Sequence, residues 1–312
     1  MATPTTIEAG RAPIAAAKAS GAKKRAGYWS GVWRRLRRDR VTMTVAAILL
    51  LIVLASIFAP WVALSDPYAG NILARLKPIG TPHHWLGTDE TGRDLWARLV
   101  YGGRMSLIGG VAPVTLALMI GGFLGIFAGY AGGIVNTIIM RAADIFYAFP
   151  SILLAIAICG FLGSGLFNSV LALAVVFVPS LIRISESVTT QTRSLLFVDA
   201  ARASGTTTLQ IIRHHILNNV LGTILVYATS LISLSIILSA GLSFLGLGIA
   251  PPTAEWGSML NAMRQAIYVQ PLVAALPGVM IFVTSICFNL VSDGLRSAMD
   301  LRIDYAAVDK KR

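Results

Sequence analysis

Residues 147–182 constrain this chain most, because they contain no Lys, Arg, Asp or Glu. A helix of about 20 apolar residues crosses a bilayer, so this stretch is too long for a single crossing. The segment GFLGSGLFN at residues 160–168 interrupts it with glycines and an asparagine, residue types that favour turns. The pattern therefore predicts two membrane-spanning helices joined by a tight turn.

Four further apolar runs have the length of a membrane span, at residues 41–64, 106–130, 220–245 and 272–292. The chain has 312 residues, of which 55% are hydrophobic and 13% are charged. Soluble domains carry about 25% charged residues, so the composition also indicates a membrane protein. We expect an all-α, polytopic membrane protein with six transmembrane helices.

The distribution of Lys and Arg predicts the topology. If the N-terminus is cytoplasmic, the inner segments hold 20 of the 26 basic residues and the outer loops hold 6. This excess follows the positive-inside rule and predicts that both termini are cytoplasmic. The expected organisation is a tail at 1–40, a first span at 41–64, an extracytoplasmic loop at 65–105, a transmembrane core at 106–292 with a cytoplasmic loop at 193–219, and a tail at 293–312.

The N-terminal tail ends in a basic segment, YWSGVWRRLRRDR, at residues 28–40. Trp29, Trp33 and Leu36 recur at helical spacing among five arginines, a pattern typical of an amphipathic helix on an anionic inner leaflet. A plain positive-inside anchor explains the same residues. The net charge of +12 would suggest nucleic acid in a soluble protein, but here the basic residues cluster in loops and tails, so we expect no nucleic-acid partner.

Two other local patterns predict structure. Gly121, Gly125 and Gly129 lie four residues apart and form a stripe of small residues, which allows close helix approach either within the chain or against a partner. In the outer loop, Thr91 and Asp94 have the spacing of a helix cap, so residues 65–105 are expected to end in a helix that leads into the second span. We expect residues 131–146 to be a short connection.

Residues 193–219, RSLLFVDAARASGTTTLQIIRHHILNN, form a polar island between two apolar runs. The pattern predicts a helix, a break at Gly205 and a second short helix. Thr207 and Gln210 have capping-box spacing at the start of that second helix. On the cytoplasmic side, such an element either docks on a partner or lies among lipid headgroups.

The chain lacks the usual signatures of an enzyme or a self-powered pump. It has no phosphate-binding loop, nucleophile elbow or H-E-x-x-H motif, and its assigned spans contain neither charged residues nor His. Cys159 and Cys287 lie in apolar runs and the four His occur as adjacent pairs, so we predict no disulfide, metal or cofactor in this chain. An ion-coupled carrier normally needs an ionisable group at membrane depth. If the protein pumps, a partner must supply the energy.

Several motifs of the sequence resemble those of a known family. The segment DAARASGTTTLQIIRHHILNN resembles the cytoplasmic loop of permease subunits of bacterial ATP-binding-cassette importers. LGTDETGRD at 86–94, LSFLGLG at 242–248 and DGLR at 293–296 are similar to the second permease of the dipeptide, oligopeptide and nickel importers. The resemblance extends over residues 28–304.

The resemblance implies a type I importer in the bacterial inner membrane. It implies a heterodimer with a second homologous permease, two cytoplasmic ATPases that bind ATP and Mg, and an extracytoplasmic substrate-binding protein. Asp199, Ala200, Ala201 and Gly205 would form the knob that docks on an ATPase, and Ile216 and Leu217 would continue the second short helix. Asp199 and Asn218 depart from the family, which usually has Glu and Pro there.

The outer motifs of the family have two interpretations: they receive the binding protein, or they fold the outer loops. The residues concerned are Gly87, Thr88, Asp89, Glu90, Gly92, Arg93, Asp94, Pro251, Pro252, Trp256 and Gly257. The resemblance implies a peptide substrate, with nickel chelates and glutathione-like peptides as alternatives. An ATP-independent channel or carrier, and a lipid-binding scaffold, are alternatives from other functional classes.

Overall fold

The computed structural model describes residues 28–299, and the regular structure in this part of the chain is helical. Two isolated β-bridges in the loop before α4 are its only extended pairings. The predicted tails therefore lie partly outside the described residues, at 1–27 and 300–312. The helices are α1 (Tyr28–Leu36), α2 (Arg40–Ile57), α3 (Ala59–Val62), η1 (Ile72–Ala74), α4 (Leu95–Ala117), η2 (Leu118–Gly122), α5 (Phe123–Ala131), α6 (Gly133–Tyr147), α7 (Ser151–Leu162), α8 (Leu166–Arg193), α9 (Leu196–Ala203), α10 (Thr208–Gln210), η3 (Ile211–Ile216), α11 (Leu217–Phe244), α12 (Trp256–Ala262), η4 (Met263–Tyr268) and α13 (Pro271–Met299).

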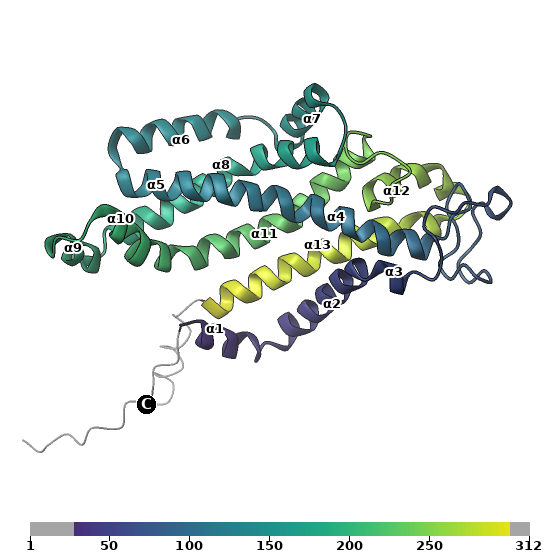
Figure 1. Cartoon of the computed structure of the whole chain (residues 1–312), viewed down its shortest axis with the longest axis horizontal. Helices are drawn as coiled ribbons and strands as arrows, with labels where there is room; N and C mark the ends of the chain where they lie inside the picture. Colours follow the sequence, from purple (N-terminus) through teal and green to yellow (C-terminus); the bar gives the residue numbers. More distant parts are fainter. Residues whose placement is uncertain (1–27, 300–312) are drawn as a thin grey trace, which may run out of the picture.

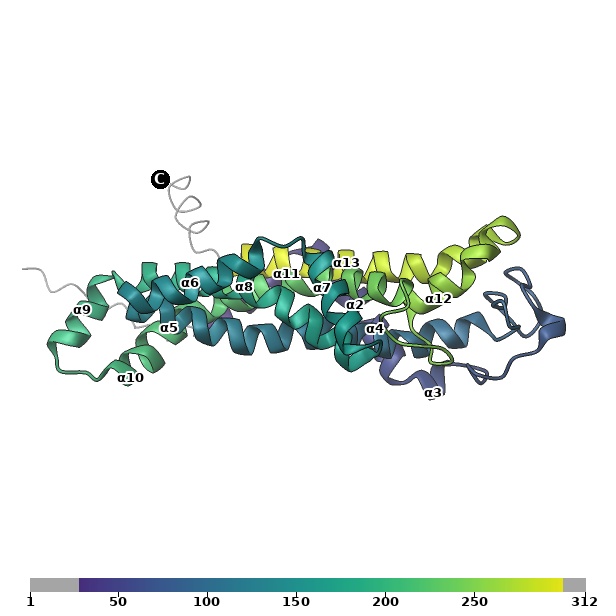
Figure 2. The same ribbon diagram turned by 90° about the horizontal axis from the view of Figure 1, so that it is seen from above.

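The long helices lie side by side in an elongated bundle (Figures 1 and 2). Five stretches of the described chain are long and apolar enough to cross a membrane, and α6 with α7 form a sixth candidate bent by 86°. One end of the bundle carries α9 and α10, and the other carries α12 and the loop before α4. We call these the α9 end and the α12 end. The six-span prediction therefore holds if the bent pair counts as one crossing.

The sequence interpretation was wrong about residues 131–146, which form helix α6 rather than a short connection. Gly132 and Gly133 both have positive φ and break the chain after α5. The charged residues of this segment lie on one helix face, where Arg141 pairs with Asp144. Consequently α7 alone is too short for a span, and the third crossing needs α6 as well.

Two other element boundaries also differ from the prediction. The second span begins at Leu95, well before residue 106, because Asp94 accepts the N–H of Ala97 at 2.9 Å and caps α4. The second helix of the polar island is not short, because α10, η3 and α11 run on as one apolar stretch over Thr208–Phe244. The end of α11 at Phe244 agrees with the predicted span, which ends at residue 245.

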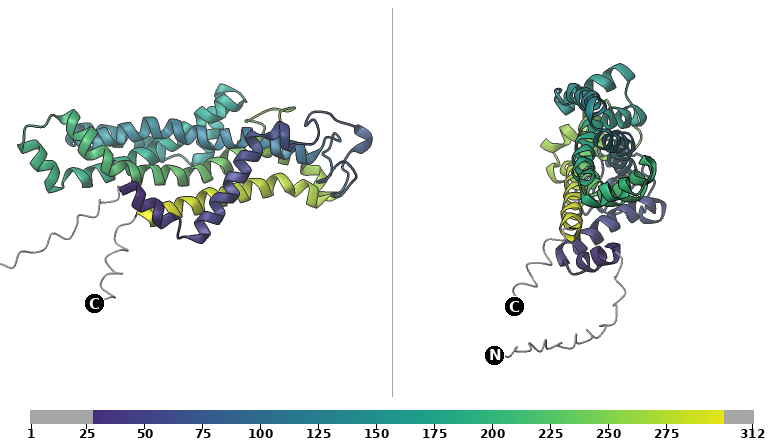
Figure 3. Two further views of the ribbon diagram at one scale, coloured as in Figure 1. Left: turned by 60° about the horizontal axis from the view of Figure 1, so that its bottom comes forward. Right: turned by 90° about the vertical axis from the view of Figure 1, so that its left-hand side faces the viewer.

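The basic segment at the N-terminus is divided, since α1 ends at Leu36 and α2 begins at Arg40. Asp39 caps α2 by accepting the N–H groups of Val41 and Thr42 at 3.1 and 3.3 Å. The guanidinium of Arg35 donates to the carbonyl of Ala298 at 3.1 Å, so α1 lies against the last helix. Figure 3 shows α1 and α2 along one edge of the bundle beside α13.

The glycine stripe packs α5 and the end of the second span against α8 within the chain. A Cβ atom added at Gly121 would lie 2.7 Å from the carbonyl oxygen of Val178, and one at Gly125 would lie 2.4 Å from that of Ile182. Backbone is thus in direct contact with backbone, which only glycine permits. Of the two explanations left open by the sequence, the structure selects close packing inside the chain.

Candidate functional site

The polar island forms a projecting element at the α9 end of the bundle (Figure 1). Helix α9 ends at Ala203, and Gly205 then turns the chain with a φ of +78°. The N–H of Gly205 donates to the carbonyl of Arg202 at 3.0 Å, and the N–H of Thr206 donates to that of Ala201 at 3.2 Å. These bonds close the helix end in the manner of a glycine cap, as the predicted break required.

The next helix starts with the predicted capping box. The N–H of Thr207 donates to the side-chain oxygen of Gln210 at 3.2 Å, and the Thr207 side chain accepts from the backbone of the same residue. A π-helical turn, η3, follows directly and leads into α11. The element is therefore connected rigidly to a long membrane helix.

Helix α9 has one face on the body of the chain and one face outward. Val198 is fully buried, and Ala201 packs partly against the main hydrophobic core. Arg202 lies 5.6 Å from the ring centre of Tyr130 and binds Asp199 at 3.1 Å. Asp199, with 60% of its side chain exposed, and Ala200 form the outward face.

The two departures from the family pattern have structural counterparts. Asp199 is held by Arg202 one turn along α9, so its shorter side chain points along the helix surface. Asn218, unlike the proline usual in the family, has a backbone N–H. Its side-chain amide also donates to the carbonyl of His214 at 3.1 Å. Of the residues predicted to continue the second helix, Ile216 is fully buried and Leu217 is half-buried, so both pack inside this chain.

At the opposite end, Asp89 organises the outer loop. Its buried carboxylate accepts the N–H groups of Thr91 and Arg93, each at 2.9 Å, and pairs with the Arg93 guanidinium at 2.6 Å. The neighbouring Thr88 is fully buried and accepts the N–H of Lys77 at 2.8 Å. Glu90 completes the cluster with a 3.3 Å contact to Arg93.

The glycines of this loop permit close backbone contacts. Gly87 and Gly92 have φ values of +80° and +74°, a region that disfavours side chains. A Cβ atom at Gly92 would also lie 1.8 Å from the carbonyl oxygen of Asn71. The loop can therefore fold over the end of α4 only with glycine at these positions.

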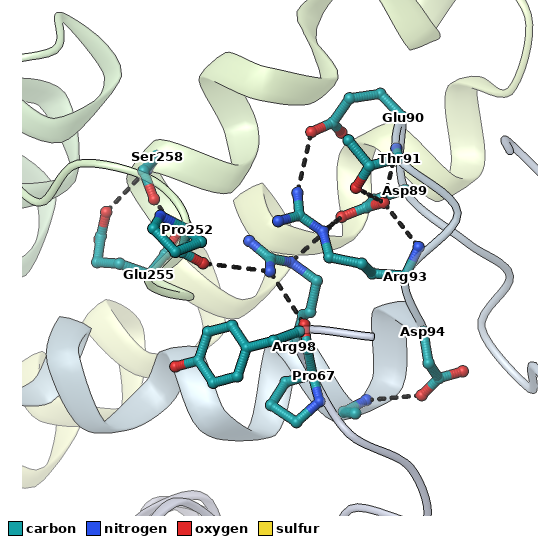
Figure 4. Close-up of polar contacts among 12 residues, drawn as sticks. Pro67, Asp89, Glu90, Thr91, Arg93, Asp94, Arg98, Pro252, Glu255 and Ser258 are labelled. Atoms are coloured by element: carbon teal, nitrogen blue, oxygen red, sulfur yellow. Dashed lines mark hydrogen bonds and ion pairs between the residues drawn. The ribbon is translucent and has the colours of Figure 1, made fainter. Parts of the chain in front are cut away.

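Sequence reasoning missed Arg98, which joins three separate segments at the α12 end (Figure 4). This buried side chain donates to the carbonyls of Pro67 and Pro252 at 3.1 and 3.4 Å. Its Nε lies 3.3 Å from the Asp89 carboxylate. Its position four residues after the cap Asp94, on the first turn of α4, was the sequence feature that could have indicated its role.

Glu255 was also missed, although it immediately precedes the Trp-Gly pair of the motif. Its buried carboxylate accepts the N–H groups of Gly257 and Ser258 at 2.9 and 2.8 Å and caps α12. The hydroxyl of Ser106 on α4 donates to the same carboxylate at 3.1 Å. The indole N–H of Trp256 donates to the carbonyl of Leu99 at 2.8 Å. The second outer motif therefore fixes α12 to α4.

Most of the predicted outer residues therefore have partners inside the chain. Asp89, Asp94, Trp256 and Gly257 are buried, and a Cβ atom at Gly257 would lie 2.4 Å from the carbonyl oxygen of Ala240. These contacts favour the folding role for the outer motifs. Within residues 28–299, no group of three or more His, Cys, Asp or Glu side chains is arranged to hold a metal ion.

Comparison with known proteins agrees with this architecture. Residues 121–305 match the family described as the binding-protein-dependent transport system inner membrane component. Residues 27–78 match the N-terminal transmembrane domain of oligopeptide transport permease C.

The similar proteins include glutathione transport system permease protein GsiD of Escherichia coli O6:K15:H31, which is 41% identical over 88% of this chain and 91% of its own length. The protein of the same name from Pectobacterium atrosepticum is 39% identical over the same shares.

The fold also has a solved counterpart. An inward-facing structure of the MetNI methionine ABC transporter matches 64% of this chain and 96% of its own chain, with a TM-score of 0.53 and 20% sequence identity. That likeness is one of fold. Taken with the family matches, it identifies this chain as a membrane-spanning permease in the family of binding-protein-dependent importers, within the peptide and nickel group of ATP-binding-cassette systems.

Proposed function

We propose that this chain forms half of a translocation pore and that residues 193–219 receive force from a cytoplasmic ATPase. The observation that carries the proposal is the shape of the α9 end, where a capped helix–glycine–helix element projects beyond the bundle. Its outward face holds Asp199 and Ala200, and its inward face is fixed by Val198. A partner can bind the outer face without disturbing the inner one.

The connections of α9 explain how a push or pull would reach the membrane. The helix follows α8 after only two residues, and beyond the turn at Gly205 the segments α10 and η3 run without interruption into α11. Both α8 and α11 pack against α4 in the middle of the bundle. A displacement of α9 therefore moves two central helices together, as a two-state switch requires.

The remaining partners follow from the same proposal. A homologous permease would supply the other half of the pore, two ATPases would bind ATP and Mg, and an extracytoplasmic protein would deliver the substrate. The α9 end would then be cytoplasmic, together with both termini, which agrees with the excess of Lys and Arg in those segments. This chain itself would bind no cofactor.

The proposed cargo is a small peptide. The N-terminal match to an oligopeptide permease supports peptides as a class, and the GsiD relatives favour a glutathione-like tripeptide among the alternatives. Nickel chelates have less support from these relatives. Binding of candidate peptides to the cognate extracytoplasmic protein, measured by calorimetry, would identify the cargo.

The test of coupling uses the complete importer in liposomes and the variant Ala200→Arg. A charge placed in a packed subunit interface is left unpaired, and such losses amount to about 3–5 kcal/mol. Substrate uptake and binding-protein-stimulated ATP hydrolysis should fall at least about tenfold. Ala200 is a better choice than Ala201, because Ala201 packs against its own core.

Two controls separate docking from general damage. Ala200→Ser keeps a small side chain, and Ala131→Arg adds the same charge at an exposed site on α5 at the same end. Both should retain uptake. Normal uptake by Ala200→Arg would refute the proposed docking face. Flux through this chain alone, without ATPases, would instead support an ATP-independent channel.

A further inference from the structure

A charged and aromatic cluster lies where the corner between α6 and α7 meets α8 and α11. Its members are Asp144, Tyr147, Ser180, Arg183 and Tyr227. We propose that this cluster lines the translocation pathway at its α9-end mouth and contacts the ionic ends of a passing peptide. The proposal rests on the transport function above and extends it to particular side chains.

The polar groups of the cluster lie on three helices. Arg183 of α8 binds the carboxylate of Asp144 of α6 at 2.5 Å, and its guanidinium carbon lies 4.8 Å from the ring centre of Tyr147. Ser180 of α8 and Tyr227 of α11 line the same cavity, so the hydroxyl groups of these two helices lie on one side of the cluster. The cluster thus has an ionic side and a hydroxyl side.

A cavity of about 210 Å³ lies next to these groups. Its walls include Tyr147, Phe149, Phe177, Ser180 and Tyr227, so aromatic rings and hydroxyl groups contribute to its lining together with aliphatic side chains. Small-molecule sites commonly combine apolar walls with a few polar groups that orient the ligand. This volume suits one or two amino-acid side chains of a peptide and is too small for a whole one.

Contacts with other helices place the cluster near the α9 end of the membrane spans. The hydroxyl of Ser292 on α13 donates to the carbonyl of Val226, next to Tyr227. Two residues nearer the α9 end, Gly294 contacts Thr42, which lies in the first turn of α2. Tyr227 and Ser180 therefore lie just inside the spans, with Arg183 about one turn farther toward the α9 end.

The exposure of the Arg183–Asp144 ion pair indicates that this face of α8 borders water or other polar groups. The α8 span is the most buried of the five, at 56% of its apolar window, yet Arg183 is 45% exposed and Asp144 is 38% exposed. Charged side chains near a bilayer face water or other polar groups, and the short side chain of Asp144 cannot reach far for them. A water-filled pathway on this face of α8 meets that requirement.

The chemistry matches a free peptide. Asp144 can accept from an ammonium group, Arg183 can donate two parallel hydrogen bonds to a carboxylate, and Tyr147 offers a ring face. Exposed ion pairs are individually weak, so a passing peptide can exchange with the Asp144–Arg183 contact without being trapped. A transport site needs such weak binding, because tight binding would slow release.

The first test measures access of water to Tyr147, whose side chain is 56% exposed. Tyr147→Cys in the complete importer is treated with a charged, membrane-impermeant methanethiosulfonate, and mass spectrometry locates the label. Leu51→Cys, on α2 at 66% exposure, is the lipid-facing control. The two native cysteines are buried and give little background. Reaction at residue 147 should be at least about tenfold faster than at residue 51, and equal rates would overturn the proposal.

The second test compares uptake of a peptide with a free carboxylate and the same peptide as its amide, both bound equally by the delivery protein. Arg183→Gln should lower the maximal uptake rate of the free acid about tenfold and change that of the amide less than twofold. Arg183→Lys should restore part of the rate for the acid. Arg38→Gln is the matched control, because Arg38 is exposed on the segment between α1 and α2 and is not part of the cluster.

The outcomes separate this inference from the transport proposal. An equal loss for acid and amide in Arg183→Gln would mean a structural role and would overturn the inference, while uptake by the unmodified importer remained intact. If the unmodified importer transports no peptide, the proposed function fails. The cysteine test still decides whether Tyr147 faces water in that case.

Discussion

Substituting Gly125 by Ala tests whether the contact between α5 and α8 determines the arrangement of the bundle. The new Cβ atom would lie 2.4 Å from the carbonyl oxygen of Ile182 and 2.6 Å from the Cβ of Ser185. Ordinary contacts begin near 3.4 Å, so the helices must separate by about 1 Å. A backbone oxygen in a packed helix cannot move aside as a flexible side chain does.

The expected magnitude follows from a comparison with Gly160→Ala on α7. No atom lies within 4 Å of a Cβ added there. Both variants gain about the same helix propensity, roughly 1 kcal/mol. The difference between their free energies of unfolding therefore measures the steric cost at Gly125. Overpacking of this kind costs about 1–3 kcal/mol. For soluble domains of comparable size, a difference of about 2 kcal/mol lowers the unfolding temperature by roughly 4–8 °C.

The assay is thermal unfolding of the purified importer in one detergent, with both variants measured side by side. Gly125→Ala should unfold several degrees below Gly160→Ala and should elute with an altered size or lose uptake. Equal unfolding temperatures would refute the conclusion that α5 and α8 are in backbone contact.

Three further predictions concern the two ends of the bundle. Asp89→Asn removes a buried partner of two arginines and should cost about 3–5 kcal/mol, seen as rapid proteolysis of the outer loop, while the exposed Asp66→Asn should not. Glu255→Ala should lower stability by about 1–2 kcal/mol in thermal unfolding, because α12 loses its cap. Gly205→Pro should abolish ATP-driven uptake, whereas Gly205→Asn should retain most of it, since Asn tolerates positive φ and no atom lies within 4 Å of an added Cβ.

The sequence predicted those features that depend on local patterns. Long apolar runs gave the spans, and Thr207 with Gln210 marked a helix start that the structure confirms. The prediction of a short connection at residues 131–146 was wrong for a physical reason. A packed helix can carry charged side chains if they pair with charges on a neighbouring helix, as Asp144 of α6 does with Arg183 of α8. That pairing joins residues far apart in the chain, so no window of sequence contains it.

The same limit applies to the outer end. The sequence paired Thr91 with Asp94 as a cap, but in the structure Asp94 itself caps α4 by accepting the N–H of Ala97, three residues away. Arg98, in contrast, binds the carbonyl of Pro252, 154 residues along the chain. Ser106 and Glu255 are likewise 149 residues apart. Family resemblance pointed to Trp256 and Gly257, but the charged groups that hold their loop became evident only when α4 and α12 were placed side by side.

Helix α8 unites the two proposals about function. It ends at Arg193, next to α9, and carries Arg183 ten residues earlier, which corresponds to about 15 Å along a helix. Between these points, Gly125 and Gly129 hold α8 against α5 in direct backbone contact, so this part of α8 cannot slide or bend independently of α5. A force on α9 is therefore transmitted to Arg183 with little loss in flexible segments. Opening of the pathway mouth and movement of the ATPase-docking element should accordingly be a single event, in which Arg183 separates from Asp144 when α8 moves relative to α6.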